Sequence, residues 1–161
     1  MSVETFLGLG SNLGDRLHYL ELAVKVLRGF DPDLTVSPVY ESAPLDAPEP
    51  QSRYLNCVVR LETDLTARQL LETAHALEDL TGRSRTVRNA PRRLDVDILL
   101  VGDIQISEPD LVVPHPRMSE RGFVLAPLED LDASRVPANW RSRLAETDPA
   151  SLDLRLVATL E

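Results

Sequence analysis

The sequence predicts an α+β protein with a ferredoxin-like β-α-β-β-α-β core. Two observations support this fold class: segments with strand and helix periodicity follow one another in that order, and two strands divide into apolar and polar faces. The length of 161 residues suits one domain, residues 1–161. In this fold two helices cover one face of an antiparallel sheet, so we expect a functional site on the other face.

The N-terminal part begins with a predicted strand over residues 3–9, where β-prone and apolar residues predominate. A helix is predicted after the turn at residues 10–15 and ends before Gly29. Its apolar side chains recur at helical spacing: Leu17, Leu20, Val24 and Leu27. The turn offers three possible N-caps: Ser11, Asn12 and Asp15.

The middle of the chain predicts two strands separated by a loop. The first spans residues 35–40, and residues 43–53 hold three prolines, which favour a loop. The next strand, residues 54–62, alternates between two faces. One face carries Leu55, Cys57, Val59 and Leu61, and the other carries Tyr54, Asn56, Val58 and Arg60.

The second helix and the last core strand follow. Thr66 and Gln69 form a capping box that opens a helix, and Gly82 ends it. Residues 94–101 then predict a strand with two faces. Leu94, Val96, Ile98 and Leu100 point one way, and Asp95 and Asp97 point the other.

The remaining residues are less regularly patterned. We expect a short hairpin around residues 101–107, a helix near 140–146 and a last strand or helix near 152–160. No internal repeat, low-complexity tract or linker divides the chain.

Composition and charge exclude several classes of protein. The net charge of −9 argues against a general nucleic-acid binder, because such proteins must neutralise phosphates. No apolar run approaches the roughly 20 residues that span a bilayer, and no signal-peptide pattern opens the chain. The one cysteine, Cys57, excludes an internal disulfide framework. We therefore expect a cytoplasmic monomer with no nucleic-acid or membrane partner.

The most informative stretch joins a basic loop to an acidic strand. Residues 83–93 contain no acid but five arginines: Arg83, Arg85, Arg88, Arg92 and Arg93. Asp95 and Asp97 follow on one strand face, with Cα atoms about 6.5–7 Å apart. Arginine binds phosphate oxygens and paired carboxylates bind one or two Mg²⁺ ions. The carboxylate pair alone favours a solvated strand face, but the adjacent arginines favour a metal–nucleotide site.

Three further features have competing interpretations. Residues 8–14 resemble a glycine-rich phosphate loop but lack the lysine of a P-loop, so a tight strand-to-helix turn explains them better. His115 lies between two prolines, which hold it in an extended loop with its ring presented and not buried in a helix. It is either an ordinary surface histidine or a residue that binds a phosphate or donates a proton. Tyr54 is placed to stack on a flat ligand, whereas core packing is the simpler interpretation of Phe123.

Several short motifs occur together in a recognisable order. They are Gly10-Ser-Asn-Leu-Gly14, Tyr54-Leu-Asn56, Gly82-Arg83-Ser-Arg85, Pro91-Arg92-Arg-Leu-Asp95-Val-Asp97-Ile98, Pro114-His115 and Arg121-Gly-Phe123. From about residue 5 to 130 the chain resembles the 6-hydroxymethyl-7,8-dihydropterin pyrophosphokinase family of folate biosynthesis. The family often has Trp-Gly where this chain has Asn89-Ala90. The resemblance implies a ferredoxin-like fold and the transfer of a pyrophosphoryl group from MgATP to 6-hydroxymethyl-7,8-dihydropterin, with release of AMP.

The resemblance also implies residue roles. Asp95 and Asp97 would ligate two Mg²⁺ ions that bridge the ATP phosphates, and Arg83 and Arg92 would be the catalytic arginines. The ATP site would be formed by Glu78, Arg85, Ile98, His115 and Arg121. The pterin ring would lie between Tyr54 and Phe123, with its edge bonded by Asn56 and with Ser42, Pro44 and Leu45 along the pocket.

Two alternatives come from other functional classes. A metal-dependent phosphohydrolase would use the same aspartates to activate water, and product analysis would separate it from a transferase. A small RNA-binding module is the other alternative, because arginine loops on ferredoxin-like sheets suit RNA. The net charge of −9 and the acidic pair on that sheet face argue against RNA binding.

Overall fold

The computed structural model describes residues 1–44, 50–82 and 91–161, and its N-terminal part follows the predicted order of elements. This part contains β1 (Val3–Ser11), α1 (Arg16–Leu27), β2 (Thr35–Val36), β3 (Val39–Ser42), β4 (Tyr54–Thr63), α2 (Ala67–Leu80) and β5 (Asp95–Val101). The C-terminal part adds β6 (Ile106–Glu108), β7 (Leu111–Val113), η1 (Met118–Glu120), α3 (Gly122–Leu131), η2 (Ala133–Arg135), α4 (Trp140–Thr147), η3 (Pro149–Leu152) and β8 (Leu154–Ala158).

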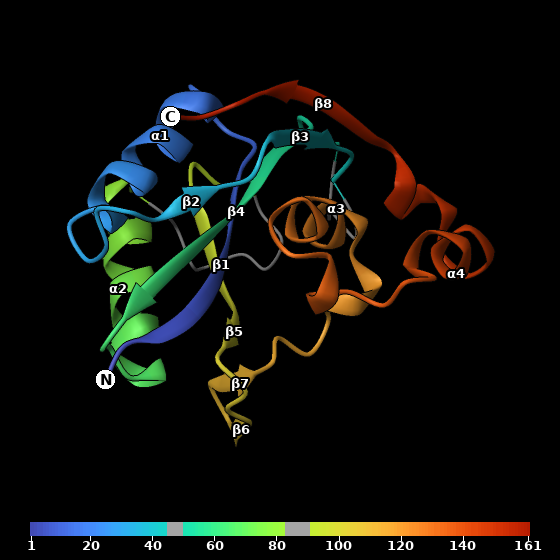
Figure 1. Ribbon diagram of the computed structural model, residues 1–161. Helices are drawn as coiled ribbons and strands as arrows, with labels where there is room; N and C mark the ends of the chain where they lie inside the picture. Colours follow the sequence, from blue (N-terminus) through green and yellow to red (C-terminus); the bar gives the residue numbers. More distant parts are fainter. Residues whose placement is uncertain (45–49, 83–90) are drawn as a thin grey trace.

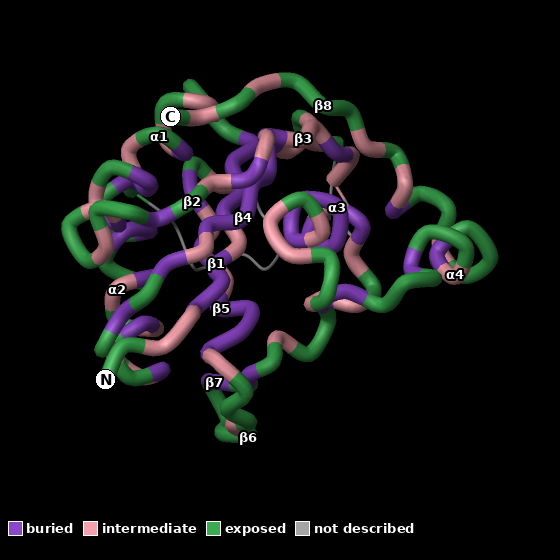
Figure 2. Tube along the Cα trace, viewed as in Figure 1, coloured by how far each residue is buried: buried purple, intermediate pink, exposed green. Residues whose placement is uncertain are grey.

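The core is one antiparallel sheet with strand order β5-β1-β4-β3-β8, in which β2 also pairs with β4 (Figure 1). The predicted β-α-β-β-α-β fold is confirmed. The central strands β1 and β4 consist mainly of buried residues, and Figure 2 shows most of their length in purple. Side chains in the middle of this sheet are therefore packed against other residues on both of its faces.

Helices α1 and α2 cover one face of the sheet (Figure 1). Asp15 caps α1 by accepting a hydrogen bond from the His18 N–H at 3.2 Å, and Thr66 and Gln69 form the predicted capping box of α2. Both helices pack against the face that alternation predicted to be apolar, which includes Leu55, Cys57, Val59 and Leu61. This packing leaves the polar side chains of β4 and β5 on the opposite face.

The opposite face is only partly open, because α3 packs against it (Figure 1). A second apolar cluster forms there from Phe6, Val58 and Leu99 of the sheet with Leu125 and Trp140 of the C-terminal helices. The sequence did not predict α3. The functional site must lie in the part of this face that α3 leaves uncovered.

The predicted strand over residues 35–40 is interrupted. Pro38 has no N–H and cannot continue the ladder, so β2 ends at Val36 and β3 begins at Val39. Ser37 makes the local contacts to β4 instead. Its backbone N–H donates to the Val58 carbonyl at 2.9 Å, and its hydroxyl accepts from the Val58 N–H at 2.8 Å.

The predicted orientation of Leu100 was wrong because β5 contains a bulge. In the register with β1, Phe6 pairs with Leu100 but Leu7 pairs with Ile98, which leaves Leu99 as an extra residue. The alternation therefore shifts after Ile98, and Leu100 joins the second apolar cluster. Asp95 and Asp97 precede the bulge and keep their predicted face.

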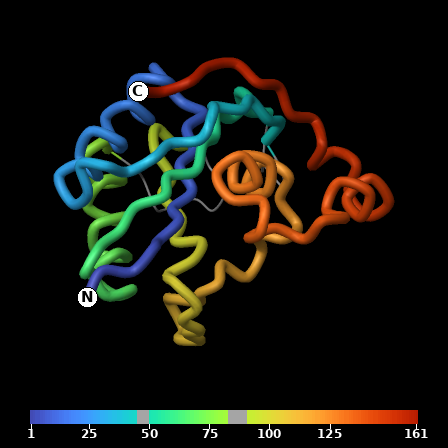
Figure 3. The backbone as a smooth tube through the Cα atoms, viewed as in Figure 1, coloured from blue at the N-terminus to red at the C-terminus, as the bar shows by residue number. Residues whose placement is uncertain are grey.

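The C-terminal elements correspond in part to the prediction. The hairpin lies at β6–β7, a few residues beyond the expected 101–107, because Gly102 turns the chain at positive φ before β6 begins. Helix α4 is confirmed, and the last segment is a strand. Figure 3 shows this strand, β8, running alongside β3 at the sheet edge. Across the described ranges of the chain, every helix is too short or too polar to cross a membrane.

Candidate active site

Asp95 and Asp97 face the open part of the sheet next to two glycines of β1. Gly10 pairs with Asp95 on one side and Asn56 on the other, so it lies between the two side chains. A Cβ atom at Gly10 would lie 3.3 Å from the Asn56 Oδ1. The absence of a side chain at position 10 therefore keeps open the space between the acidic pair and Asn56.

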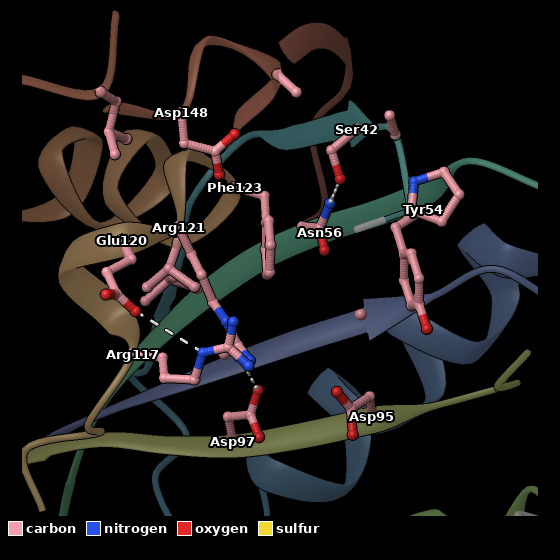
Figure 4. A pocket seen from close by; sticks show the side chains of 18 of the residues that line it. Ser42, Tyr54, Asn56, Asp95, Asp97, Arg117, Glu120, Arg121, Phe123 and Asp148 are labelled. Atoms are coloured by element: carbon pink, nitrogen blue, oxygen red, sulfur yellow. Dashed lines mark hydrogen bonds and ion pairs between the residues drawn. The ribbon is translucent and has the colours of Figure 1, made fainter. Parts of the chain in front are cut away.

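Arginines flank the acidic pair, and Figure 4 shows Arg121 beside Asp97. The Arg92 Nη1 lies 2.9 Å from the Asp95 Oδ1, and the Arg121 Nη1 lies 3.8 Å from the Asp97 Oδ2. Burial, and next the neighbouring Asp95 carboxylate, raise the pKa of Asp97 to about 7. The arginines therefore do not fully offset the cost of burying the Asp97 charge beside Asp95, and a cation bound there would stabilise the ionised pair.

The donor set fits a metal ion that arrives with its substrate. In the ranges 1–44, 50–82 and 91–161, no three or more His, Cys, Asp or Glu side chains are grouped to hold a metal. Two carboxylates are enough for Mg²⁺, which keeps several waters and takes further oxygens from phosphates. Asp95 and Asp97 thus fit Mg²⁺ bound to a polyphosphate better than a permanent metal site.

Two cavities meet at the acidic pair. The larger has a volume of about 810 Å³ and the smaller about 370 Å³, and Arg92, Asp95 and Asp97 line both. The other predicted site residues divide between them. The larger cavity is lined by Ser42, Pro44, Tyr54, Asn56, Arg121 and Phe123, and the smaller by Glu78, Ile98 and His115.

The larger cavity contains a slot between two aromatic rings. Tyr54 on β4 and Phe123 on α3 stand on either side of Asn56 (Figure 4), so Phe123 lines the cavity and is not only a core residue. The Asn56 Nδ2 donates to the Ser42 hydroxyl at 2.8 Å, which fixes the amide orientation. The Asn56 Oδ1 then faces the slot as an acceptor. This arrangement suits a flat heterocycle with N–H groups on its edge.

His115 borders the smaller cavity with its Nε2 3.9 Å from the Asp97 Oδ1. Its Nδ1 accepts a hydrogen bond from the Arg117 backbone N–H at 3.2 Å, which leaves the proton on Nε2. Burial and the nearby Arg121 lower the pKa of His115 to about 4. Near neutral pH His115 is therefore an uncharged hydrogen-bond donor, and this argues against the proton-donor interpretation.

Glu78 is buried at the base of the smaller cavity. Its Oε2 accepts a hydrogen bond from the Val96 N–H at 3.1 Å, between the two aspartates of β5. Glu78 thus holds the strand that presents the acidic pair.

Glu78→Ala is expected to lower the free energy of unfolding by about 1–3 kcal/mol, because the Val96 N–H loses a buried acceptor. Urea denaturation monitored by circular dichroism measures this. Glu72→Ala on the exposed face of the same helix is the matched control. Equal stability of the two variants would contradict the structural role of Glu78.

Asn12, predicted from the sequence as a possible helix cap and as part of the Gly10–Gly14 motif, holds the backbone of Arg92. Its Oδ1 accepts from the Arg92 N–H at 2.8 Å, and its own N–H donates to the Arg92 carbonyl at 2.9 Å. The Asn12 Nδ2 donates to the Gln51 side chain at 2.9 Å and the Ser52 carbonyl at 3.2 Å. Asn12 therefore connects the backbone of Arg92 to the segment before Tyr54. The Gly-Ser-Asn motif was the available signal.

Three predicted site residues lie outside the described residues: Leu45, Arg83 and Arg85. Arg88, for which the sequence suggested no role, lies there as well. Their expected roles stay predictions.

The fold and site define the class of protein. An acidic pair between two cavities, flanked by arginines, is typical of an enzyme that binds a metal–nucleotide beside an acceptor and transfers a phosphoryl or pyrophosphoryl group. The 7,8-dihydro-6-hydroxymethylpterin-pyrophosphokinase (HPPK) family matches residues 6–133. The chain belongs to this family. Its reaction is therefore pyrophosphoryl transfer to hydroxymethyldihydropterin in folate biosynthesis.

Individual relatives agree with this assignment. The chain is 44% identical over 128 residues to a Bacillus subtilis 2-amino-4-hydroxy-6-hydroxymethyldihydropteridine pyrophosphokinase, covering 78% of this chain and 76% of that protein. It is 40% identical to the protein of the same name from Pseudomonas aeruginosa, covering 81% and 82%.

A solved structure supports the fold. Wild-type Plasmodium falciparum HPPK-DHPS matches with a TM-score of 0.71 at 14% identity, covering 100% of this chain and 49% of that one. The chain thus spans about half the length of that structure. Family membership excludes the phosphohydrolase and RNA-binding alternatives as the main activity.

Proposed function

We propose that MgATP binds in the smaller cavity and 6-hydroxymethyl-7,8-dihydropterin in the larger, so that their reacting atoms meet over Asp95 and Asp97. One observation carries this proposal: the two cavities have Arg92, Asp95 and Asp97 in common. A shared wall of this kind places two bound substrates in contact, which is the main requirement of phosphoryl transfer.

Asp95 and Asp97 would hold two Mg²⁺ ions together with phosphate oxygens. Bound there, the ions would neutralise phosphate charge and orient the reacting groups. The raised pKa of Asp97 supports this proposal, because burial and the neighbouring Asp95 carboxylate both disfavour its charged form, which a bound cation would stabilise.

The pterin ring would stack between Tyr54 and Phe123, with an edge N–H donating to the Asn56 Oδ1. Ser42, Pro44 and Leu45 would line the slot. The slot geometry between β4 and α3 supports this assignment, and the fixed orientation of the Asn56 amide supports recognition of a donor edge. Asp95 and Asp97 line the same cavity, so the hydroxymethyl group would lie within reach of them.

The hydroxymethyl oxygen would attack the β-phosphorus in line, with AMP leaving. Arg92 and Arg83 would stabilise the charge that develops on the leaving side. Arg85 and the Nε2–H of His115 would bind phosphate oxygens, with Glu78 and Ile98 shaping the nucleotide cavity. Arg121 lines the larger cavity beside Asp97 and would bind phosphate oxygens where the two cavities meet. Both cavities are lined by one copy of the chain, which supports action as a monomer. The buried thiol of Cys57 is compatible with a cytoplasmic location.

The decisive experiment incubates the protein with MgATP, with and without 6-hydroxymethyl-7,8-dihydropterin, and separates the nucleotides by chromatography. We expect AMP only when both substrates are present. Release of ADP or phosphate that does not depend on the pterin would contradict the proposal. Omission of Mg²⁺ is expected to stop AMP formation.

A further inference from the structure

The C-terminal segment beyond residue 133 lies outside the region that matches the family, yet it is firmly attached to the domain. Trp140 of α4 is buried, and its Nε1 donates to the Glu129 carboxylate of α3 at 2.8 Å. Strand β8 pairs with β3 at the sheet edge. Residues 151–154, here called the brace segment, lead from α4 into β8 and include its first residue.

Ser151 of the brace segment is locked to the residue between Arg121 and Phe123. The buried Ser151 hydroxyl accepts a hydrogen bond from the Gly122 N–H at 2.7 Å. A Cβ atom at position 122 would lie 2.0 Å from the Ser151 carbonyl oxygen, so only glycine permits this approach. The backbone next to Phe123, one wall of the aromatic slot, therefore lies directly against Ser151.

The next residues of the brace segment contact the opposite wall of the slot. Asp153 forms a two-pronged ion pair with Arg53, the neighbour of Tyr54, at 2.9 and 3.0 Å. Leu154 pairs with Ser42, whose hydroxyl orients the Asn56 amide. Four consecutive residues thus join the α3 side of the slot to its β3–β4 side.

We propose that the brace segment fixes the separation of the two aromatic walls, with Ser151 as a positioning residue for Phe123. The proposal rests on the proposed pterin site. The segment touches the wall residues through their chain neighbours and would not contact the ligand. Its effect should therefore appear in pterin affinity and not in the binding of ATP, whose proposed cavity is formed by α2, β5 and the segment around His115.

Ser151→Ala removes the acceptor of the Gly122 N–H and tests this proposal. Isothermal titration of the pterin, at saturating Mg²⁺ and a non-hydrolysable ATP analogue, is expected to show a dissociation constant raised about fivefold. The dissociation constant of the ATP analogue should change by less than about twofold. Ser142→Ala is the matched control, because Ser142 lies exposed in the same C-terminal segment and should leave both constants unchanged.

A double-mutant cycle asks whether Ser151 acts through Phe123. In a Phe123→Leu background, Ser151→Ala should no longer weaken pterin binding by more than about twofold. Asp153→Asn provides a second variant at an exposed position, where a smaller loss of about twofold is expected. Any of three results would overturn the proposal. They are unchanged pterin affinity in both single variants, an equal loss of pterin affinity in Ser142→Ala, and additive losses of Ser151→Ala and Phe123→Leu in the cycle. Failure of the wild-type protein to bind the pterin at all would instead contradict the proposed function.

Discussion

Asp97→Asn is expected to lower the rate of AMP formation by about 10²- to 10³-fold or more, because one of the two carboxylates proposed to hold the metal is lost. AMP production at saturating MgATP and pterin measures this effect. Asp103→Asn, at the exposed turn after β5, is the control and should retain normal activity. Near-normal turnover by Asp97→Asn would contradict the metal assignment.

The same substitution is expected to stabilise the protein when no divalent ion is present. The pKa of Asp97 is about 7 in the fold against an ordinary value of 3.8, so the folded state binds a proton more tightly than the unfolded state. The free energy of unfolding should therefore fall as pH rises from about 4 to about 7. Urea denaturation across this range should show a shallower fall for Asp97→Asn than for the wild type. Identical pH dependence would contradict the raised pKa.

Arg92→Ala is expected to reduce kcat by about 10²- to 10³-fold while changing pterin affinity much less. Arg92 contacts Asp95 at 2.9 Å and borders both cavities, so it is placed to stabilise charge during transfer. Steady-state kinetics paired with pterin titration separates the two effects.

The neighbouring Arg93 offers a matched control for this experiment. Arg93 is exposed and donates to the Thr81 carbonyl at 3.3 Å, away from the acidic pair. Arg93→Ala should therefore keep normal kcat. A large loss of pterin affinity in Arg92→Ala with unchanged kcat would count against the proposed role of Arg92.

Local patterns predicted the parts of the site that depend on one strand or one cap. The alternation of residues 94–98 placed Asp95 and Asp97 on the face opposite the core, because successive side chains of a strand point to opposite sides. The Thr66–Gln69 capping box marked the start of α2 for the same local reason.

Features that depend on distant contacts could not be predicted in this way. The bulge at Leu99 follows from its register with β1, and the burial of Phe6 and Val58 follows from packing against α3. Nothing near Ser151 in the sequence indicates that it contacts Gly122. The division of the site residues between two cavities likewise appears only when β4, β5 and α3 are brought together.

The position of the brace segment late in the chain has a consequence for biosynthesis. The described residues that line the smaller cavity all precede residue 117, so a growing polypeptide can complete that cavity early. The aromatic slot must wait for residues 151–154 to leave the ribosome. On a ribosome stalled between these two points, the nascent chain would be able to bind a nucleotide. Its acceptor site would still be incomplete, so it could not transfer a pyrophosphoryl group from the bound ATP.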